Sequence, residues 1–210
     1  MKKNCTEVVF ILDRSGSMCG LEKDTIGGFN SLINKQKKQD GEVLVSTVLF
    51  NDSSVVIHDR KPIDEVRLMT NKDYEVYGCT ALLDALGSSI RHIGNIHKYA
   101  RIEDVPEHTM FVIITDGMEN ASRYYSKERV KLMIEYEKEK YGWEFLFLAA
   151  NMDAIDTASQ YGIDKDHAVN YQCDSVGTRL NYEVLDEAIQ CICSGVPLSK
   201  SWKSKIEKRK

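Results

Sequence analysis

The sequence predicts an α/β protein whose doubly wound, mainly parallel sheet has one antiparallel edge strand and carries helices on both faces. Two apolar runs, TEVVFIL at 6–12 and TMFVIIT at 109–115, are continuous, which is typical of strands buried on both faces. Stretches with apolar residues at helical spacing alternate with runs of this kind, and glycine or polar breaks separate them. Regular alternation favours a parallel sheet covered by helices.

The first half of the chain is expected to contain a helix and three strands, two of them in a hairpin. In order, these elements are a strand at 6–12, a helix at 21–39, strands at 42–50 and 53–59, and an irregular stretch at 60–79. Ile26, Phe29 and Ile33 share one face of the helix. The turn-forming pair Asn51-Asp52 predicts the hairpin, whose second strand is mixed enough in polarity to lie at an edge.

The second half repeats the alternation of helix and strand. The expected elements are helices at 80–99, 126–142, 153–161 and 178–193, with strands at 109–115, 143–150 and 167–171 between them. Ser126 predicts the start of its helix as an N-cap, and Gly142 predicts the end. In the last helix, Leu185, Ala188 and Ile192 lie on one apolar face.

A single domain is expected over residues 1–197. The chain has 210 residues, of which 42% are hydrophobic, enough for one sizeable core, and it contains no internal repeat or domain-scale linker. After Pro197 it reads LSKSWKSKIEKRK, which is basic and lacks a convincing apolar face. Residues 198–210 are therefore expected to form a flexible, solvated tail.

Composition excludes several classes of function. A net charge of −4 gives no general attraction to nucleic acid or to an anionic membrane. Independently of charge, no small-molecule substrate is expected. No apolar run approaches the roughly 20 residues that cross a bilayer, and the apolar run near the N-terminus reads as a first strand, not a secretion signal. The six cysteines include no C-x-x-C pair, so we expect free thiols and a cytoplasmic location.

Polar side chains stand where the two buried strands end. Asp13 directly follows the first apolar run, and Ser15 and Ser17 come after it in VVFILDRSGSMCG. Asp116 follows the run at 109–115. If the two strands are neighbours, both carboxylates lie at the same rim of the sheet, where doubly wound proteins bind ligands. Two carboxylates that close repel one another, and a divalent cation between them removes the conflict.

Thr80, at the start of an amphipathic helix in GCTALLDA, adds a third hydroxyl from another loop. Taken alone, each of these residues has an ordinary explanation: serines and Asp116-Gly117 are common in turns, and threonine is a common N-cap. Taken together at three strand ends, they form an all-oxygen set that favours Mg²⁺ or Mn²⁺ over zinc or copper.

This pattern resembles the metal-ion-dependent adhesion site of von Willebrand factor A domains. Asp13-x-Ser15-Gly16-Ser17, then Thr80, then Asp116 in ITDG agree in type and order, and the β-α pattern agrees over about residues 5–193. The resemblance implies a Rossmann-like fold with three directly ligating hydroxyls and with carboxylates that act directly or through water. The lack of a secretion signal is more similar to bacterial intracellular members than to extracellular adhesion modules.

The resemblance also implies a function in binding. A cation held mostly by neutral ligands keeps positive charge and can take an acidic residue of a partner protein, so we expect an Mg²⁺- or Mn²⁺-dependent adaptor and not an enzyme. The alternative is a phosphoryl-transfer enzyme or receiver on a similar fold. Phosphatases of the haloacid-dehalogenase type carry Asp-x-Asp after the first strand, whereas this chain has Asp13-x-Ser15 and therefore lacks the second carboxylate.

Other residues near the proposed site allow two interpretations. Cys19 and Cys79 are small packing residues or a redox pair, and packing is favoured. Glu119 and Asn120 either line the rim or belong to a solvated turn. In some members of the family, movement of the last helix is coupled to the metal loops, and residues 178–193 would be the corresponding helix here.

Overall fold

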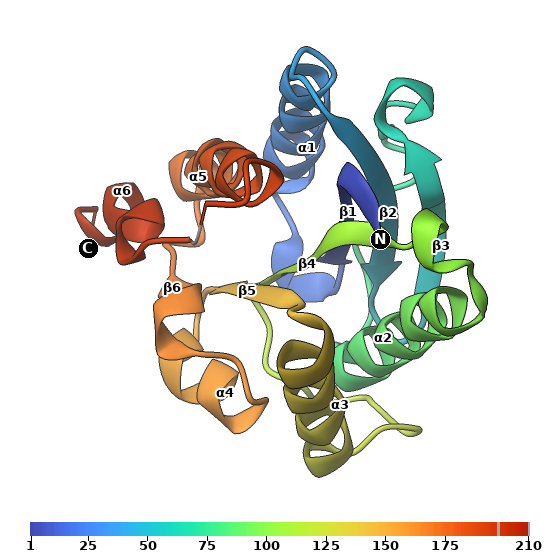
Figure 1. The fold of residues 1–210 in the computed structure, drawn as a ribbon. Coiled ribbons are helices and arrows are strands. Elements are labelled where there is room, and N and C mark those ends of the chain that lie inside the picture. The colour runs from blue at the N-terminus through green and yellow to red at the C-terminus, as the bar shows by residue number, and fades with distance from the viewer. Residues whose placement is uncertain (197, 210) are drawn as a thin grey trace.

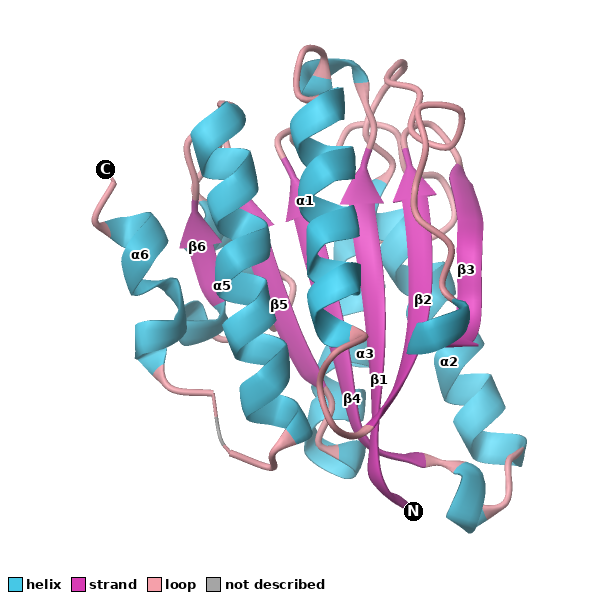
Figure 2. Ribbon diagram, turned by 90° about the horizontal axis from the view of Figure 1, so that it is seen from above, coloured by secondary structure: helices cyan, strands magenta, loops and turns pink. Residues whose placement is uncertain are grey.

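The described residues form a six-stranded sheet between two layers of helices (Figures 1 and 2). The computed structural model describes residues 1–196 and 198–209. The strands are β1 (Lys2–Asp13), β2 (Glu42–Phe50), β3 (Ser54–Pro62), β4 (Pro106–Thr115), β5 (Glu144–Ala149) and β6 (Ala168–Asn170). Their order is β3-β2-β1-β4-β5-β6, and every neighbouring pair is parallel except β2 with β3. The predicted fold class, including its antiparallel edge strand, is confirmed.

Helices cover both faces of this sheet. They are α1 (Glu22–Gln36), α2 (Leu82–Tyr99), α3 (Lys127–Tyr141), α4 (Ala154–Gln160), α5 (Ser175–Cys193) and the short α6 (Ser204–Glu207). Figure 1 shows α1 and α5 on one face and α2 and α3 on the other. Among the described residues, no helix has the length and apolar character that a membrane span requires.

The continuous apolar run of β1 follows from this two-sided burial. Phe10 and Leu12 belong to the core cluster that includes residues of α1 and α5, whereas Val9 and Ile11 belong to the cluster that includes residues of α2 and α3. Because successive side chains of a strand point to opposite faces, a strand between two helical layers is apolar at every position.

The ends of α3 confirm the sequence signals for a helix. The Ser126 side chain accepts a hydrogen bond from the Arg129 amide at 3.3 Å, and Gly142 ends the helix with a left-handed φ of 66°. These are the two backbone requirements that serine and glycine satisfy best.

The expectation of a solvated tail after residue 197 is wrong for residues 200–207. A 3-10 turn at Lys200–Lys203 and helix α6 bury Trp202 and Ile206 in the core cluster beside α5. The Trp202 indole N–H donates to the carbonyl of Asp166 at 2.9 Å. Trp202 and Ile206 are four residues apart and therefore lie on the same side of this segment. Their burial attaches the segment to the core, although basic residues dominate its composition. Pro197, the expected domain boundary, lies outside the described residues.

The order of the strands places a crevice between β1 and β4. From β1 the chain builds β2 and β3 on one side, then returns to β4 on the other side of β1. The carboxyl ends of the parallel strands lie together at the upper edge in Figure 2. In open α/β sheets, ligands bind at this edge where the winding direction reverses.

Candidate metal centre

Asp13 and Asp116 meet at this crevice. β1 pairs with β4 in parallel, with Leu12 opposite Ile114. The two strands are therefore neighbours, as the predicted site requires. Asp13 is the last residue of β1, and Asp116 follows the last residue of β4. Both residues are buried: the exposed fraction of the surface is 1% for Asp13 and 2% for Asp116.

The loop between β1 and α1 carries the two serines to the same point. The Ser15 amide donates to Asp13 Oδ1 at 2.7 Å, which holds the loop against the strand end. The hydroxyls of Ser15 and Ser17 lie 3.1 Å apart, and the Ser17 hydroxyl donates to Asp116 Oδ1 at 2.5 Å. Three of the predicted residues therefore form one hydrogen-bonded chain with Asp13.

Thr80 completes the cluster, and the geometry around Gly117 locates it. A methyl group in the Cβ position of Gly117 would lie 2.7 Å from Thr80 Oγ1, 3.2 Å from Ser17 Oγ and 3.5 Å from Ser15 Oγ. All three hydroxyl oxygens thus surround one small space, which stays open because residue 117 has no side chain. The space lies beside Asp116.

Thr80 is not the N-cap of α2, which was its ordinary explanation. The N-cap is Ala81, and the hydroxyl of Thr80 makes no hydrogen bond to a described residue. Asn120 holds its backbone instead. The side-chain Oδ1 of Asn120 accepts a hydrogen bond from the backbone amide of Thr80 at 2.9 Å, and the backbone amide of Asn120 donates to the Thr80 carbonyl at 3.0 Å. A hydrogen bond of 3.0 Å from the Gly16 amide to the Gly78 carbonyl joins the threonine loop to the serine loop.

Glu119 and Asn120 support the loops and do not take part in the hydroxyl cluster. The Glu119 carboxylate accepts hydrogen bonds from the amides of Leu83, Ala121 and Ser122 and from the Ser122 hydroxyl. The bond from Leu83 joins the loop after β4 to the first turn of α2, and the other three hold this loop together. Of the two interpretations, lining the rim and belonging to a solvated turn, neither is complete: both residues fix the loops at the rim, and Glu119 also lines a cavity beside it.

Burial raises the pKa of Asp13 above the ordinary aspartate value. Hydrogen bonds from Thr115 and Ser15 counteract part of this increase, and the nearby charge of Asp116 adds to it. Asp13 Oδ2 accepts from the Thr115 hydroxyl at 2.5 Å. A cation near both carboxylates would relieve the same cost of holding negative charge away from water.

Sequence reasoning missed Thr115 and Cys173 as neighbours of the centre. Thr115 is the last residue of a buried strand, and only the pairing of β1 with β4 brings it to Asp13. The Cys173 thiol donates to Asp116 Oδ2 at 3.3 Å from the loop before α5. Burial, together with this contact, raises the pKa of Cys173 to about 11, so the thiol stays protonated and can donate.

Arg14 adds positive charge to the same loop. It stands between Asp13 and Ser15, is only 7% exposed, and its guanidinium lies 5.5 Å from the centre of the Tyr77 ring. The Nε atom has no hydrogen-bond partner, and the side chain forms no ion pair with a described residue. A buried cation without a counter-charge favours the approach of an anion.

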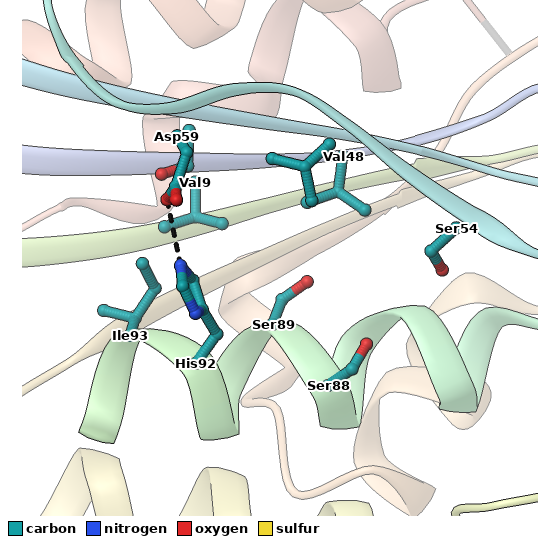
Figure 3. Close-up of a pocket in the computed structure, with 10 residues that line it drawn as sticks. Val9, Val48, Ser54, Asp59, Ser88, Ser89, His92 and Ile93 are labelled. Atoms are coloured by element: carbon teal, nitrogen blue, oxygen red, sulfur yellow. Dashed lines mark hydrogen bonds and ion pairs between the residues drawn. The ribbon is translucent and has the colours of Figure 1, made fainter. Parts of the chain in front are cut away.

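Cys19, Cys79 and the cavity between β3 and α2 lie outside this cluster. Cys19 and Cys79 are both exposed, so the favoured interpretation as packing residues is wrong. A cavity of about 430 Å³ between β3 and α2 is lined by Asp59 and His92, whose Oδ1 and Nε2 atoms lie 2.9 Å apart (Figure 3). None of the five candidate metal ligands lines it.

The donor set suits a hard divalent cation. Three hydroxyls and two carboxylates are all oxygen ligands, which Mg²⁺ and Mn²⁺ prefer. The described residues contain no group of three or more His, Cys, Asp or Glu side chains that could hold a metal. The centre is therefore built mainly from hydroxyls, and the space beside Gly117 fits such an ion.

No protein-family model matches the sequence, and no curated protein matches it. Many solved structures match the fold. The von Willebrand factor domain of the type V pilus tip protein Mfa5 from Porphyromonas gingivalis has a TM-score of 0.66 at 10% identity, with 92% of this chain and 97% of that chain covered. A von Willebrand factor type A protein from Catenulispora acidiphila has a TM-score of 0.56 at 13% identity, with 88% and 42% covered.

A third similar structure contains a metal. Proximal thread matrix protein 1 from the mussel byssus, with a zinc-occupied metal-ion-dependent adhesion site, has a TM-score of 0.60 at 13% identity, with 90% of this chain and 47% of that chain covered. The present chain therefore spans less than half of two of these three proteins. Its fold is that of von Willebrand factor A domains, as the resemblance implies.

Proposed function

We propose that the protein is an Mg²⁺- or Mn²⁺-dependent binding module that captures an acidic residue of a partner protein. The observation that carries this proposal is the convergence of three hydroxyls on the space beside Gly117, next to two buried carboxylates. Ser15, Ser17 and Thr80 would hold the ion directly. Asp13 and Asp116 would act directly or through water, and their hydrogen bonds to the loops would orient the hydroxyls.

Charge supports an acidic partner. When bound, the ion supplies a positive centre that neutral hydroxyls leave largely uncompensated, and it can accept one further oxygen ligand. The unpaired guanidinium of Arg14 in the same loop adds to this attraction for an anion. Binding of this kind requires no turnover, and we propose that the protein is not an enzyme and acts inside the cell.

Metal-dependent stability tests the proposal. Binding to the folded state raises the thermal midpoint, so titration with Mg²⁺ or Mn²⁺, with acetate as a free carboxylate, is expected to raise that of the unmodified chain. Asp116→Ala is expected to abolish the rise, because it removes a carboxylate at the space beside Gly117. Cys19→Ala, at an exposed residue outside the cluster, is expected to keep it.

Two outcomes contradict the proposal. The first is an unchanged midpoint of the unmodified chain at millimolar metal, and the second is an equal rise in both variants. Hydrolysis of a generic phosphatase substrate with Mg²⁺, lost in Asp13→Asn, would instead support the phosphoryl-transfer alternative.

A further inference from the structure

A cavity of about 410 Å³ opens directly beside the candidate metal centre. It is lined by Gly117 and its two following residues, by the first turn of α2 and by residues 152–161 around α4. Gly117 is also the residue whose missing side chain leaves room among the three hydroxyls. The candidate metal centre and the cavity therefore share Gly117.

The cavity has an apolar wall. Leu82 and Leu83 from the start of α2, with Met118 and Met152 from the loops, contribute side chains to its lining. Met118 is 69% exposed and is therefore accessible to a ligand. Methionine is flexible and adapts to the shape of a bound side chain. This wall can accommodate several methylene groups.

Two carboxylates, those of Asp153 and Asp156, line the cavity at α4. Asp153 uses Oδ1 to accept hydrogen bonds from the amides of Ile155 and Asp156, both at 3.0 Å. Asp156 uses Oδ2 to accept from the Gln160 side chain at 2.6 Å. The other oxygen of each carboxylate makes no hydrogen bond or ion pair with a described residue. Both aspartates line the cavity and are exposed.

Two further charged groups line the cavity, and one of them, Lys127, is a cation. The Lys127 ammonium donates to Gln160 Oε1 at 2.8 Å, and the Glu119 carboxylate accepts bonds from the loop after β4 and the start of α2. Three carboxylates (Glu119, Asp153 and Asp156) against the one ammonium of Lys127 leave the lining with a net charge of −2, and the free oxygens are those of Asp153 and Asp156. A metal centre that attracts an anion thus lies next to an apolar cavity that attracts a cation.

We propose that this cavity binds a lysine or arginine side chain of the partner, close in sequence to the acidic residue held at the metal centre. The inference rests on the proposed function and adds the second half of the recognition motif. The methylene groups of such a side chain would lie along Leu83 and Met118, and its charged end would reach Asp153 and Asp156. Long basic side chains bury their methylene groups in this way while the charged group stays in contact with solvent.

Selection from a peptide library tests the inference. Cyclic peptides with one fixed aspartate and random neighbours are bound to the full chain in Mg²⁺ and released with EDTA. Lysine or arginine is expected to be enriched within about two positions of the aspartate, the distance that a long side chain can bridge from there. Replacing that residue by norleucine is expected to weaken binding of the selected peptide about tenfold, because it removes a charge-assisted contact.

A matched pair of protein variants locates the contact. Asp153→Asn with Asp156→Asn keeps an N-cap side chain on α4 and is expected to remove the tenfold preference while the metal-induced rise in thermal midpoint stays unchanged. Asp40→Asn with Glu139→Gln removes the same two charges at exposed positions outside the cavity. This second variant is expected to retain the preference.

The outcomes separate the inference from the proposed function. If the EDTA-released peptides lack a basic residue near the aspartate, the inference is wrong but the proposed function stands. The same holds if the variant Asp153→Asn with Asp156→Asn still binds the basic peptide about tenfold more tightly than its norleucine form. An unmodified chain that responds to metal but yields no EDTA-released peptide overturns the inference together with carboxylate capture.

Discussion

At the scale of single residues, the candidate centre could be predicted because its two carboxylates end apolar runs and its hydroxyls stand in loops or at the start of a helix. Asp13 and Asp116 end buried strands, and the serines follow at once, so their position at the rim is readable from local sequence. Thr115 could not be recognised, because its hydroxyl reaches Asp13 only through pairing between strands 102 residues apart. Cys173 was equally hidden, since a loop on the far side of β5 brings it to Asp116.

Gly117→Ala tests the space among the hydroxyls. The new methyl group would lie 2.7 Å from Thr80 Oγ1, closer than real contacts allow, and would push this proposed ligand away from the other two hydroxyls. We expect the variant to fold and to lose the metal-induced rise in thermal midpoint. Calorimetric titration with Mg²⁺ measures the loss directly, and an affinity equal to that of the unmodified chain would show that the ion is bound elsewhere.

Gly27→Ala is the matched control for that substitution. Gly27 lies inside α1, is exposed, and has nothing within 4 Å of the position of an added Cβ. Alanine is expected to raise the free energy of unfolding by about 0.5–1 kcal/mol, because it restricts the unfolded chain and favours the helix. Metal binding is expected to stay unchanged in calorimetry.

At the scale of elements, the signals at the ends of α3 were reliable, whereas α1 ends three residues before its predicted limit, α5 begins three residues before its own, and composition misled at the C-terminus. Serine and glycine mark the limits of α3, because their local hydrogen bonding and backbone freedom need no knowledge of the rest of the fold. The composition of the C-terminal segment misled because its basic residues outnumber the two apolar residues, Trp202 and Ile206, whose burial decides its structure. Burial of Trp202 and Ile206 depends on a groove formed by distant elements, which the segment itself does not encode.

Trp202→Ala tests the docking of this segment. Removing a buried indole, together with its hydrogen bond to Asp166, is expected to lower the free energy of unfolding by about 3 kcal/mol in urea denaturation. Lys200→Ala is the control, since Lys200 is exposed and makes one surface ion pair with Asp166. That control is expected to cost less than about 1 kcal/mol. Equal effects of the two substitutions would mean that the segment is solvated.

The ion pair between Arg209 and Asp174 predicts a pH dependence. Paired hydrogen bonds from the Arg209 guanidinium, at 2.7 and 2.8 Å, lower the pKa of Asp174 to about 2. Because the folded pKa lies below the unfolded value of about 3.9, the pair stabilises the fold above pH 4 and loses this effect as the pH falls toward 2. Asp174 also caps α5, so the pair joins the C-terminal segment to that helix.

Arg209→Gln measures this dependence. The variant is expected to have a lower urea midpoint than the unmodified chain at pH 6, and the difference is expected to shrink as the pH falls from 4 to 2. A difference that stays constant, or that grows on acidification, would contradict the assignment of the shift to this pair.

At the scale of the whole molecule, the alternation of strands and helices predicted the class of fold, but not the neighbours within the sheet. The proposed site depended on a condition, that the strands ending at Asp13 and Asp116 lie side by side. Strand order is decided by long-range packing and by the direction in which each connection turns. The structure places β4 next to β1, and the residues then meet at the reversal of winding.

The most direct test of the account is a crystal structure of the protein with Mn²⁺, whose anomalous scattering locates the ion. The account predicts one peak beside Gly117, coordinated by the hydroxyls of Ser15, Ser17 and Thr80, with the carboxylates of Asp13 and Asp116 in contact directly or through water. A peak held by other residues, or no peak at this rim of the sheet in saturating Mn²⁺, would contradict it.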